Sequence, residues 1–365
     1  MSSPPVALIT GGAGFVGTNL AHRLALGGRH VVVFDNLSRK GVSENLEWLG
    51  QRHPGRIAAM VGDVRDERAV HAAVGRADEV YHLAAQVAVT TSLDDPVRDF
   101  EINARGTLNV LEAVRASRTP TPLIYTSTNK VYGALRDITL DRAGSRYTPT
   151  DAEIRALGVS ERRELDFHSP YGCSKGCADQ YVLDYARTFG LPAVVFRMSC
   201  IYGPHQRGNE DQGWVAHFLI SALENKPVTL FGDGLQVRDV LYIDDLVAAF
   251  QLAMQNIAKL SGQAFNVGGG PANTLSLVEL ITWLEQHCDV SPNIRHAAAR
   301  LGDQKYYVSD TTRFCSATGW HPSVSTAEGL QLLRSWLAHP GDVEERDVRS
   351  SAEHTAQGAA AGVSR

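Results

Sequence analysis

Tyr171 and Lys175 stand four residues apart, and the run that follows them, residues 178–187, is typical of a helix. At 3.6 residues per turn, this spacing places the phenol and the ammonium on one helix face, one turn apart. A phenol has an ordinary pKa of about 10 and is a poor base at neutral pH, but a nearby cation favours the phenolate and lowers that pKa. The pair could therefore take a proton from an alcohol while a hydride leaves the same carbon. Because this spacing also arises by chance, the hypothesis needs a dinucleotide site and a third hydrogen-bonding group.

The dinucleotide site is indicated near the N-terminus, where an apolar run at residues 6–10 and an amphipathic segment at residues 18–26 flank a glycine-rich turn. The turn carries three glycines, each three residues from the next: Gly11, Gly14 and Gly17. A strand, a glycine turn and a helix form the context of a phosphate-binding turn, because glycine lets the backbone approach closely and the free N–H groups at the helix start favour a pyrophosphate. A turn that merely connects strand and helix is the alternative.

Asp35 ends a second apolar run, residues 30–34, and indicates which dinucleotide binds. An acid at this place can accept both hydroxyls of the adenosine ribose and repels a 2′-phosphate, which favours NAD over NADP. Arg39 and Lys40 follow closely and could hold a 2′-phosphate, so the sequence favours NAD without excluding NADP.

Two further apolar runs, residues 56–61 and 80–83, predict the third and fourth strands. Asp63 follows the third strand and could meet the adenine. His82 lies inside the fourth, and we interpret it as a core histidine rather than a catalyst. The residues after this strand are small enough to pass beneath the cofactor: Ala84, Ala85 and Gln86.

The third hydrogen-bonding group follows the fifth predicted strand, residues 123–125, where a hydroxyl-rich segment contains Thr128. Ligands bind at this edge of doubly wound sheets. A long helix is predicted at residues 96–115, and its Asn103 either braces the turn near the nicotinamide or simply packs. A sixth strand, residues 193–197, completes an alternation of strands and helices that predicts an α/β fold with a Rossmann-like doubly wound parallel sheet.

Beyond residue 203 the alternation loosens, which indicates a smaller α/β domain that binds the substrate. Helices are predicted at residues 214–223, 244–254, 275–286 and 324–337, and strands at residues 228–231, 238–242 and 264–267. We expect residues 1–200 to form the NAD-binding domain, with added segments from about 236–270, and residues 201–339 to form mainly the substrate domain. The tail, residues 340–365, is rich in Ala, Gly, Ser and charge and is expected to be disordered.

The composition is that of an ordinary globular protein: 365 residues, 44% hydrophobic, 21% charged, with a net charge of −5. The lack of a basic excess argues against a nucleic-acid partner. No apolar run approaches the roughly 18–20 residues that span a bilayer, and no secretory signal pattern opens the sequence, so no membrane partner is expected. The five cysteines are odd in number and contain no C-x-x-C pair, which fits a reducing cytoplasm and predicts no metal site.

With the glycine turn, Asp35, Thr128, Tyr171 and Lys175 in register, residues 6–338 resemble the extended short-chain dehydrogenase/reductase family of nucleotide-sugar enzymes, the NAD-dependent epimerases and dehydratases. Within this family the chain is similar to the subfamily of CDP-paratose (CDP-tyvelose) 2-epimerases in six strings. They are VFDNLSRKG (residues 33–41), DFEIN (99–103), STNKVYG (127–133), DFHSPYGCSKG (166–176), DQGWV (211–215) and QVRDVL (236–241).

The resemblance implies a role for each matched residue. Tyr171 is implied as the catalytic base and acid, Lys175 as the group that lowers its pKa and holds the nicotinamide ribose, and Thr128 as the hydroxyl that orients the sugar. The implied cofactor contacts, besides Tyr171 and Lys175, are Gly11, Gly14, Phe15, Val16, Asp35, Asn36, Ser38, Arg39, Asp63, Val64, Leu83, Ala84, Ala85, Gln86 and Asn103. The implied substrate contacts are Thr128, Asn129, Ser199, Arg238 and Arg300, the two arginines because guanidinium forks suit phosphate oxygens.

The reaction implied is inversion at C2 of a nucleotide-diphosphate sugar. A C2–H with no neighbouring carbonyl is too weak an acid for direct removal, so C2 must first be oxidised. NAD would take the hydride, a 2-keto sugar would turn over in the pocket, and the hydride would return to the other face. The NAD is then regenerated in each cycle and should stay bound. A CDP-sugar is favoured, GDP-, UDP- or dTDP-sugars stay open, and the resemblance implies a homodimer or higher homo-oligomer through helices at residues 103–117 and 171–190.

The residues after Thr128 help to separate this reaction from its neighbours. The 4,6-dehydratases of the family carry an Asp-Glu pair there and the decarboxylases tend to carry Glu, whereas this chain has Asn129 and Lys130. A UDP-sugar 4-epimerase, such as a UDP-glucose 4-epimerase, remains the nearest alternative, because its core machinery is the same. A non-catalytic NAD(P)-binding sensor on the same fold is the alternative from another class, although such proteins typically lose the Tyr or the Lys that are present here.

Overall fold

A seven-stranded parallel sheet organises the molecule, and its strand order is β12-β8-β5-β4-β1-β2-β3. The computed structural model describes residues 4–288, 290, 292–300 and 303–340. The strands of the sheet are β1 (Val6–Thr10), β2 (His30–Asp35), β3 (Ile57–Val61), β4 (Glu79–His82), β5 (Leu123–Thr128), β8 (Ala193–Met198) and β12 (Gln263–Val267). Because β1 pairs with both β2 and β4, the order reverses beside β1, and ligands of doubly wound sheets bind at the carboxyl ends of the strands at such a point. The predicted fold class is confirmed.

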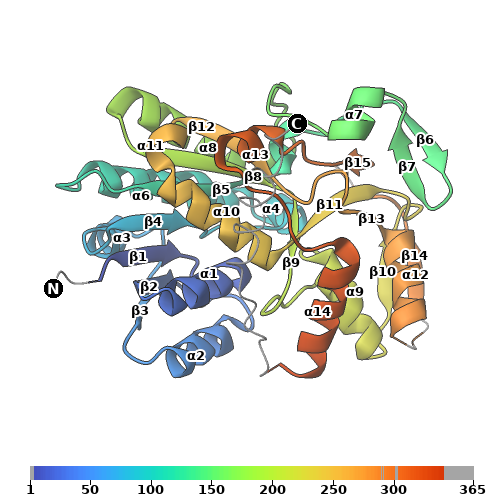
Figure 1. Cartoon of the computed structure of the whole chain (residues 1–365), viewed down its shortest axis with the longest axis horizontal. Helices are drawn as coiled ribbons and strands as arrows, with labels where there is room; N and C mark the ends of the chain where they lie inside the picture. Colours follow the sequence, from blue (N-terminus) through green and yellow to red (C-terminus); the bar gives the residue numbers. More distant parts are fainter. Residues whose placement is uncertain (1–3, 289, 291, 301–302, 341–365) are drawn as a thin grey trace, which may run out of the picture.

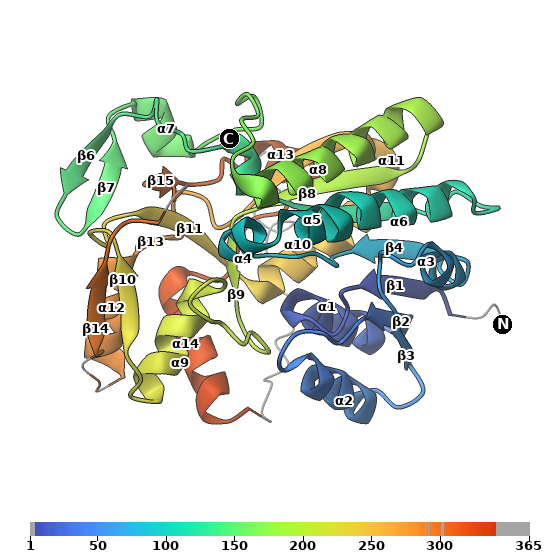
Figure 2. The same ribbon diagram turned by 180° about the vertical axis from the view of Figure 1, so that it is seen from behind.

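Helices cover both faces of this sheet (Figures 1 and 2). Successive strand side chains point to opposite faces, so Ile9 packs in one apolar core and its neighbour Leu8 in the other. On the first face lie α1 (Phe15–Leu26), α2 (Val42–Arg52), α10 (Ile243–Gln255) and α11 (Ile257–Leu260). On the second lie α3 (Glu67–Val74), α6 (Gly106–Arg115) and α8 (Ser169–Phe189), with α4 (Val89–Asp94), α5 (Pro96–Phe100) and the π-helix η1 (Glu101–Arg105) leading into α6.

The smaller part of the molecule lies beyond the carboxyl ends of the sheet strands, on the right in Figure 1. Its strand β11 pairs in parallel with β9 and β15 and antiparallel with β13. Its other strands form the parallel pair β10·β14 and the hairpin β6·β7. The strands are β6 (Leu140–Ala143), β7 (Arg146–Pro149), β9 (Cys200–Tyr202), β10 (Val228–Phe231), β11 (Val237–Tyr242), β13 (Thr274–Ser276), β14 (Ile294–Ala297) and β15 (Tyr306–Tyr307). The remaining helices are η2 (Asn129–Tyr132), α7 (Ala152–Leu157), α9 (Trp214–Leu223), α12 (Leu277–His287), α13 (Thr312–Thr318) and α14 (Thr326–Ala338).

Several predicted elements differ from those in the structure. The helix expected at residues 96–115 is divided by η1, a π-helical turn of the kind often found at functional sites, and this turn carries Asn103. The fifth strand runs on to Thr128 because its last residues pair with β8. The strand expected at residues 264–267 is β12, and it joins the main sheet beside β8 as a seventh strand. The hairpin β6·β7 was not predicted, and residues 341–365 of the expected disordered tail lie outside the described residues.

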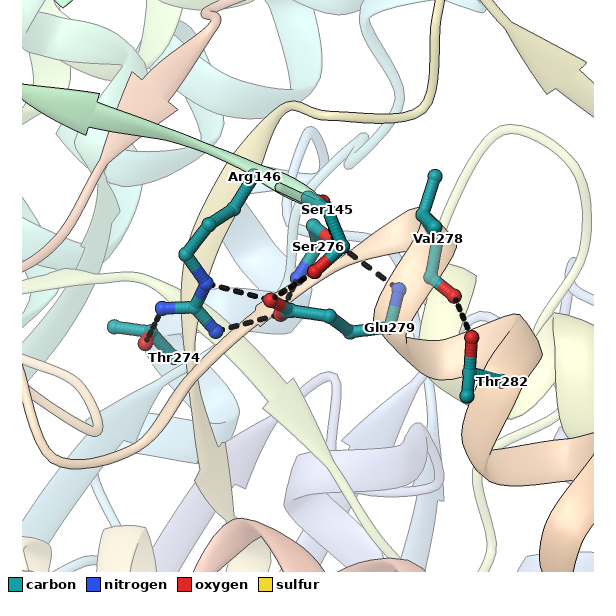
Figure 3. A network of polar contacts seen from close by, with 7 residues as sticks. All are labelled: Ser145, Arg146, Thr274, Ser276, Val278, Glu279 and Thr282. Carbon is teal, nitrogen blue, oxygen red and sulfur yellow. Dashed lines mark hydrogen bonds and ion pairs between the residues drawn. The ribbon is translucent and has the colours of Figure 1, made fainter. Parts of the chain in front are cut away.

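Helix α12 begins two residues later than predicted, because Ser276 caps it in a network shown in Figure 3. The Glu279 N–H donates to Ser276 Oγ (3.1 Å), and the Ser276 N–H donates to Glu279 Oε2 (2.9 Å), which completes a capping box. Arg146 of the hairpin donates to both Glu279 oxygens, from Nε (2.6 Å) and Nη2 (2.5 Å), and Ser145 Oγ adds a bond of 2.9 Å. One carboxylate therefore joins the hairpin to the start of α12.

Replacing Glu279 with glutamine is expected to lower the free energy of unfolding by about 1–2 kcal/mol at neutral pH, because it weakens both the cap and a partly exposed ion pair. Partial burial acts to raise the pKa of Glu279, but the bonds from Arg146, Ser276 and Ser145 outweigh it and hold the pKa below the ordinary 4.5. This contribution to stability is therefore complete above about pH 4.5 and is lost as the pH falls through the lowered pKa of the folded state.

This prediction is tested by denaturant unfolding of the wild type and E279Q at pH values from about 3 to 8, a range that includes the titration of such carboxylates. The two curves should converge at acid pH. Glu285→Gln, at an exposed position of the same helix, is the matched control and should show no such convergence. A constant gap between wild type and E279Q at all pH values would contradict the charge-based account.

Candidate active site

A cavity of about 540 Å³ lies where the carboxyl ends of β5 and β8 meet the smaller part of the molecule. It contains all three residues predicted to be catalytic: Thr128, Tyr171 and Lys175. It also contains the five residues predicted to bind substrate, which are Thr128, Asn129, Ser199, Arg238 and Arg300. Residues distant in the sequence are thus brought together in one cavity by the sheet edge and by β11.

The first two turns of α8 carry Tyr171 and Lys175, as their spacing predicts, and both are buried, with exposed fractions of 9% and 3%. The Tyr171 N–H donates to Ser92 Oγ (3.2 Å), which anchors the start of the helix. Lys175 Nζ donates to the Thr126 carbonyl oxygen (2.6 Å) and lies 4.3 Å from the centre of the Tyr125 ring. The ammonium therefore has a fixed position at the end of β5, next to the segment that ends in Thr128.

The predicted lowering of the Tyr171 pKa by Lys175 is wrong for this structure. Burial raises the pKa of Tyr171 to about 12, and a hydrogen bond with Thr128 only partly opposes this change. Burial likewise lowers the pKa of Lys175 to about 7, against the influence of Asp179 and Asp99. Both shifts favour the neutral forms, because a dry site disfavours charge. In this state the phenol holds its proton.

Asn103 braces the turn after β4, which was one of its two predicted roles. Its side chain accepts from the Gln86 N–H (2.9 Å) and donates to the Gln86 carbonyl (3.2 Å) and to Ser174 Oγ (3.1 Å). Ser174 in turn donates to Asp99, which is 1% exposed. This chain of bonds ties the helix that carries Tyr171 to the turn expected beneath the cofactor. Asp99 and Ser174 were not predicted as site residues, although both lie in strings that carried the family resemblance.

The glycine turn between β1 and α1 fits a dinucleotide. Gly11 has a φ of +68°, and a Cβ there would lie 2.8 Å from Ala84 N. A Cβ on Gly17 would lie 2.5 Å from Gly11 O, so both glycines are required by close backbone packing. Helix α1 begins after Gly14 with no side-chain cap, which leaves its first N–H groups directed at any ligand placed there.

Asp35 ends β2 beside this turn, as predicted. Its Oδ2 accepts from the Ala13 N–H (3.1 Å) and its Oδ1 from the Leu37 N–H (2.9 Å), while burial raises its pKa. A carboxylate has about four acceptor sites, so one that accepts from the N–H groups of Leu37, Ala13 and Gly14 can still accept a ribose hydroxyl. Arg39 instead donates to Gln212 Oε1 (3.0 Å) of the loop before α9, so the guanidinium is already engaged across the cavity mouth.

The other residues predicted to bind the cofactor fall into two groups. Those that line the cavity are Phe15, Val16, Leu83 and Ala85. Those beyond it are Asn36, Ser38, Asp63, Val64 and Ala84; Asn36 Nδ2 donates to Asp63 Oδ2 (2.9 Å) and its Oδ1 accepts from the Ser38 N–H (3.1 Å). His82 is fully buried between Thr10 and Thr107, and burial lowers its pKa to about 3, which is the behaviour of the predicted core histidine.

The residues predicted to grip a diphosphate are paired with acids in the cavity wall. Arg238 Nη2 donates to Asp303 Oδ1 at 2.7 Å. Arg300 donates to the Glu210 carbonyl (3.0 Å), lies 3.7 and 3.6 Å from the carboxylates of Glu210 and Asp211, and stacks on Phe231 at 3.8 Å. None of these three acids was predicted as a site residue, although Asp211 lies in one of the strings that carried the family resemblance.

The two predicted polar contacts have partners of their own. Ser199 Oγ donates to the Asp239 carbonyl (2.9 Å) and to the Asp239 carboxylate, so only its lone pairs are available to a ligand. Asn129 Oδ1 accepts from Thr128 Oγ1 (3.3 Å), and its Nδ2 donates to Gln304 Oε1 (3.4 Å). Asn129 is thus held against the catalytic threonine.

Within the described part of the chain, no helix is both long enough and apolar enough to cross a membrane. Over the same residues, no three His, Cys, Asp or Glu side chains are grouped so that they could hold a metal ion.

Comparisons with protein families, with known proteins and with solved structures give results that agree with one another. Residues 7–268 match the family described as "NAD dependent epimerase/dehydratase family". The chain is 46% identical to CDP-paratose 2-epimerase of Salmonella typhi, over 91% of this chain and 98% of that protein. Among solved structures it is similar to UDP-glucose 4-epimerase of Thermotoga maritima with UDP-glucose (TM-score 0.79, 30% identity, 92% and 100% coverage). It is also similar to Thermus thermophilus UDP-glucose 4-epimerase in complex with NAD (TM-score 0.74, 31% identity, 92% and 99% coverage).

Proposed function

Because the chain belongs to the NAD dependent epimerase/dehydratase family and is an NAD-dependent nucleotide-sugar epimerase, we propose that it inverts C2 of a CDP-sugar of the CDP-paratose type. The observation that carries the proposal is the 46% identity to a CDP-paratose 2-epimerase across almost the whole length of both chains. The cavity supports it, since Thr128, Tyr171 and Lys175 share one space with two arginines suited to a diphosphate.

The cofactor is NAD. We propose that the glycine turn holds its pyrophosphate at the start of α1 and that Asp35 accepts its adenosine ribose hydroxyls. Lys175 would hold the nicotinamide ribose. Bound NAD supplies a hydride acceptor for C2, a hydride donor for the return step, and a positive ring that favours a nearby phenolate.

In the proposed mechanism Tyr171 moves the proton and Thr128 positions the alcohol. The phenolate of Tyr171 takes the proton of the C2 hydroxyl as C2 is oxidised, and the 2-keto sugar then turns its other face toward the cofactor. Tyr171 returns the proton to the new C2 hydroxyl as C2 is reduced. The high pKa of the buried phenol suits the first step, because it favours the protonated phenol that forms when the phenolate takes the proton of the C2 hydroxyl. The Thr128 hydroxyl, anchored through Asn129, orients the sugar oxygen.

The proposal also includes the oligomeric state of the protein and its location in the cell. We infer a homodimer, supported by apolar side chains on α5 and α8 that are about half or more exposed in the single chain, among them Val97 (71%), Phe100 (49%) and Phe189 (49%). A cytoplasmic location is supported by the five cysteines, all of which are free thiols.

Incubation of the purified protein with CDP-paratose in deuterated buffer, without added NAD, tests the proposal. We expect NMR to show a product inverted at C2 that keeps its C2 proton, because the hydride returns from the cofactor and not from solvent. CDP-, GDP-, UDP- and dTDP-glucose are run in parallel to identify the nucleotide. A product inverted at C4 would replace the proposal with a 4-epimerase, and release of one NADH per product would contradict hydride return.

A further inference from the structure

Lys130 differs from the other cationic side chains of the cavity. Four Lys or Arg side chains line it among the described residues: Lys130, Lys175, Arg238 and Arg300. Lys175 is bonded to a backbone carbonyl, and each arginine is paired with cavity carboxylates. Among the residues that the structure describes, the Lys130 ammonium has no hydrogen-bond acceptor and no ion-pair partner. The acids of the cavity wall are thus bonded to the arginines, and among the described residues Asp303 influences the Lys130 ammonium without a direct bond to it.

Lys130 is also held close to the reacting groups. It lies on η2, two residues after Thr128, and its backbone N–H donates to Thr128 Oγ1 (3.2 Å). Burial lowers the pKa of its ammonium to about 8; Arg238 acts in the same direction and Asp303 opposes them. Lys130 and Arg238 thus line the same cavity, close enough for Arg238 to influence the charge of Lys130, and the backbone of Lys130 is bonded to the catalytic threonine. Two cations that share a single carboxylate carry an excess of positive charge, and this excess favours binding of an anion.

The proposed reaction puts an anion in this region. C1 of the sugar carries the diphosphate and is bonded directly to C2. When the C2 hydroxyl faces Thr128 and Tyr171, the phosphate on C1 must therefore lie immediately beside them. When C4 faces the same groups, as in a 4-epimerase, the phosphate lies across the sugar ring. A cation on the residue two positions after the catalytic threonine is thus placed to meet this phosphate in chemistry at C2 and not in chemistry at C4.

We propose that the Lys130 ammonium binds the phosphate attached to C1 of the sugar. This contact orients the sugar so that C2, and not C4, faces Thr128 and Tyr171. Lys130 is a substrate-binding residue in this role, and Arg238 supports it from β11. The inference rests on the proposed function, because it concerns the orientation of the same substrate.

The test compares binding of CDP, which retains this phosphate, with binding of CMP, which lacks it, in NAD-loaded wild type and Lys130→Met. We expect K130M to weaken CDP binding about 10- to 100-fold, the loss of one charge-assisted hydrogen bond, and to leave CMP binding unchanged. Lys130→Arg should keep most of the CDP affinity because it keeps the cation. Lys226→Met is the matched control, since Lys226 is exposed, pairs with Glu224 and does not line the cavity.

Two results would overturn the inference. Equal loss of CDP and CMP affinity would indicate that Lys130 binds a part of the nucleotide that both molecules share. Unchanged CDP affinity with a lower kcat would indicate that Lys130 transfers a proton. Thermal unfolding and NAD content establish that each variant is folded, with Lys130→Gln as a second uncharged variant. Turnover of CDP-paratose by the wild type separates the two proposals: C2 inversion with normal CDP binding by K130M rejects only the role of Lys130, whereas inversion at C4 rejects the proposed function itself.

Discussion

Replacing Tyr171 with phenylalanine is expected to lower kcat for sugar epimerisation by about 10²- to 10⁴-fold, the usual range for loss of a general acid–base group. The change removes one oxygen atom from a buried side chain whose backbone is anchored by Ser92. The fold and the NAD content should therefore persist. The measurement is single-turnover and steady-state epimerisation with the substrate identified above, together with the amount of NAD that copurifies.

Tyr181→Phe is the control for this experiment, because Tyr181 lies on the same helix with 44% of its surface exposed and does not line the cavity. It should retain wild-type activity. Full activity of Y171F would contradict the role of the phenol. A wild type that holds NAD yet converts none of the nucleotide sugars would instead favour a non-catalytic dinucleotide-binding sensor.

Replacing Asp179 with asparagine is expected to have the largest effect on stability. Asp179 and Arg197 are 0% and 5% exposed and form a two-pronged ion pair, with bonds of 2.9 Å from both Nε and Nη2. Arg197 also donates to Tyr132 Oη (3.3 Å), so the pair links α8 to β8 and η2. Removal of one charge leaves the other buried without compensation, which costs about 3–5 kcal/mol. We expect the Tm to fall by roughly 5–15 °C.

Two further variants identify the cause of this effect. Asp184→Asn breaks an exposed ion pair with Arg187 on the same helix and should leave the Tm nearly unchanged. In an Arg197→Met background, Asp179→Asn should destabilise far less, because no buried charge is left without a partner. An equal loss in both backgrounds would show that the carboxylate acts through its shape or through other bonds. Thermal unfolding of the wild type, D179N, D184N, R197M and the double variant, with denaturant titration at one temperature, makes the comparison.

The elements that carry the chemistry could be predicted because their signals are local. The glycine turn depends on three residues within one strand–turn–helix unit, and Asp35 on the end of the next strand. Tyr171 and Lys175 share a helix face through a spacing of four. Apolar runs separated by helical segments predict a parallel sheet, since such strands can be joined only by crossover connections. The family resemblance then extended the site to Thr128, Arg238 and Arg300, which no local pattern connects.

What the sequence determined by itself is therefore the fold class, the dinucleotide turn and the identity of the reacting side chains, all of which depend on short-range periodicity and residue type. Only the tertiary structure determined the protonation of those side chains and the partners with which they are paired. Burial raises the pKa of Tyr171 in place of the expected lowering, because removal of water outweighs the hydrogen bond with Thr128, while the Lys175 ammonium is directed at the Thr126 carbonyl. The carboxylates that engage Arg238 and Arg300 come from distant segments, and among the described residues no such pair is formed by Lys130, the side chain that we propose to bind a phosphate. Charge balance inside a cavity is a sum over residues far apart in the chain, so spacing cannot encode it.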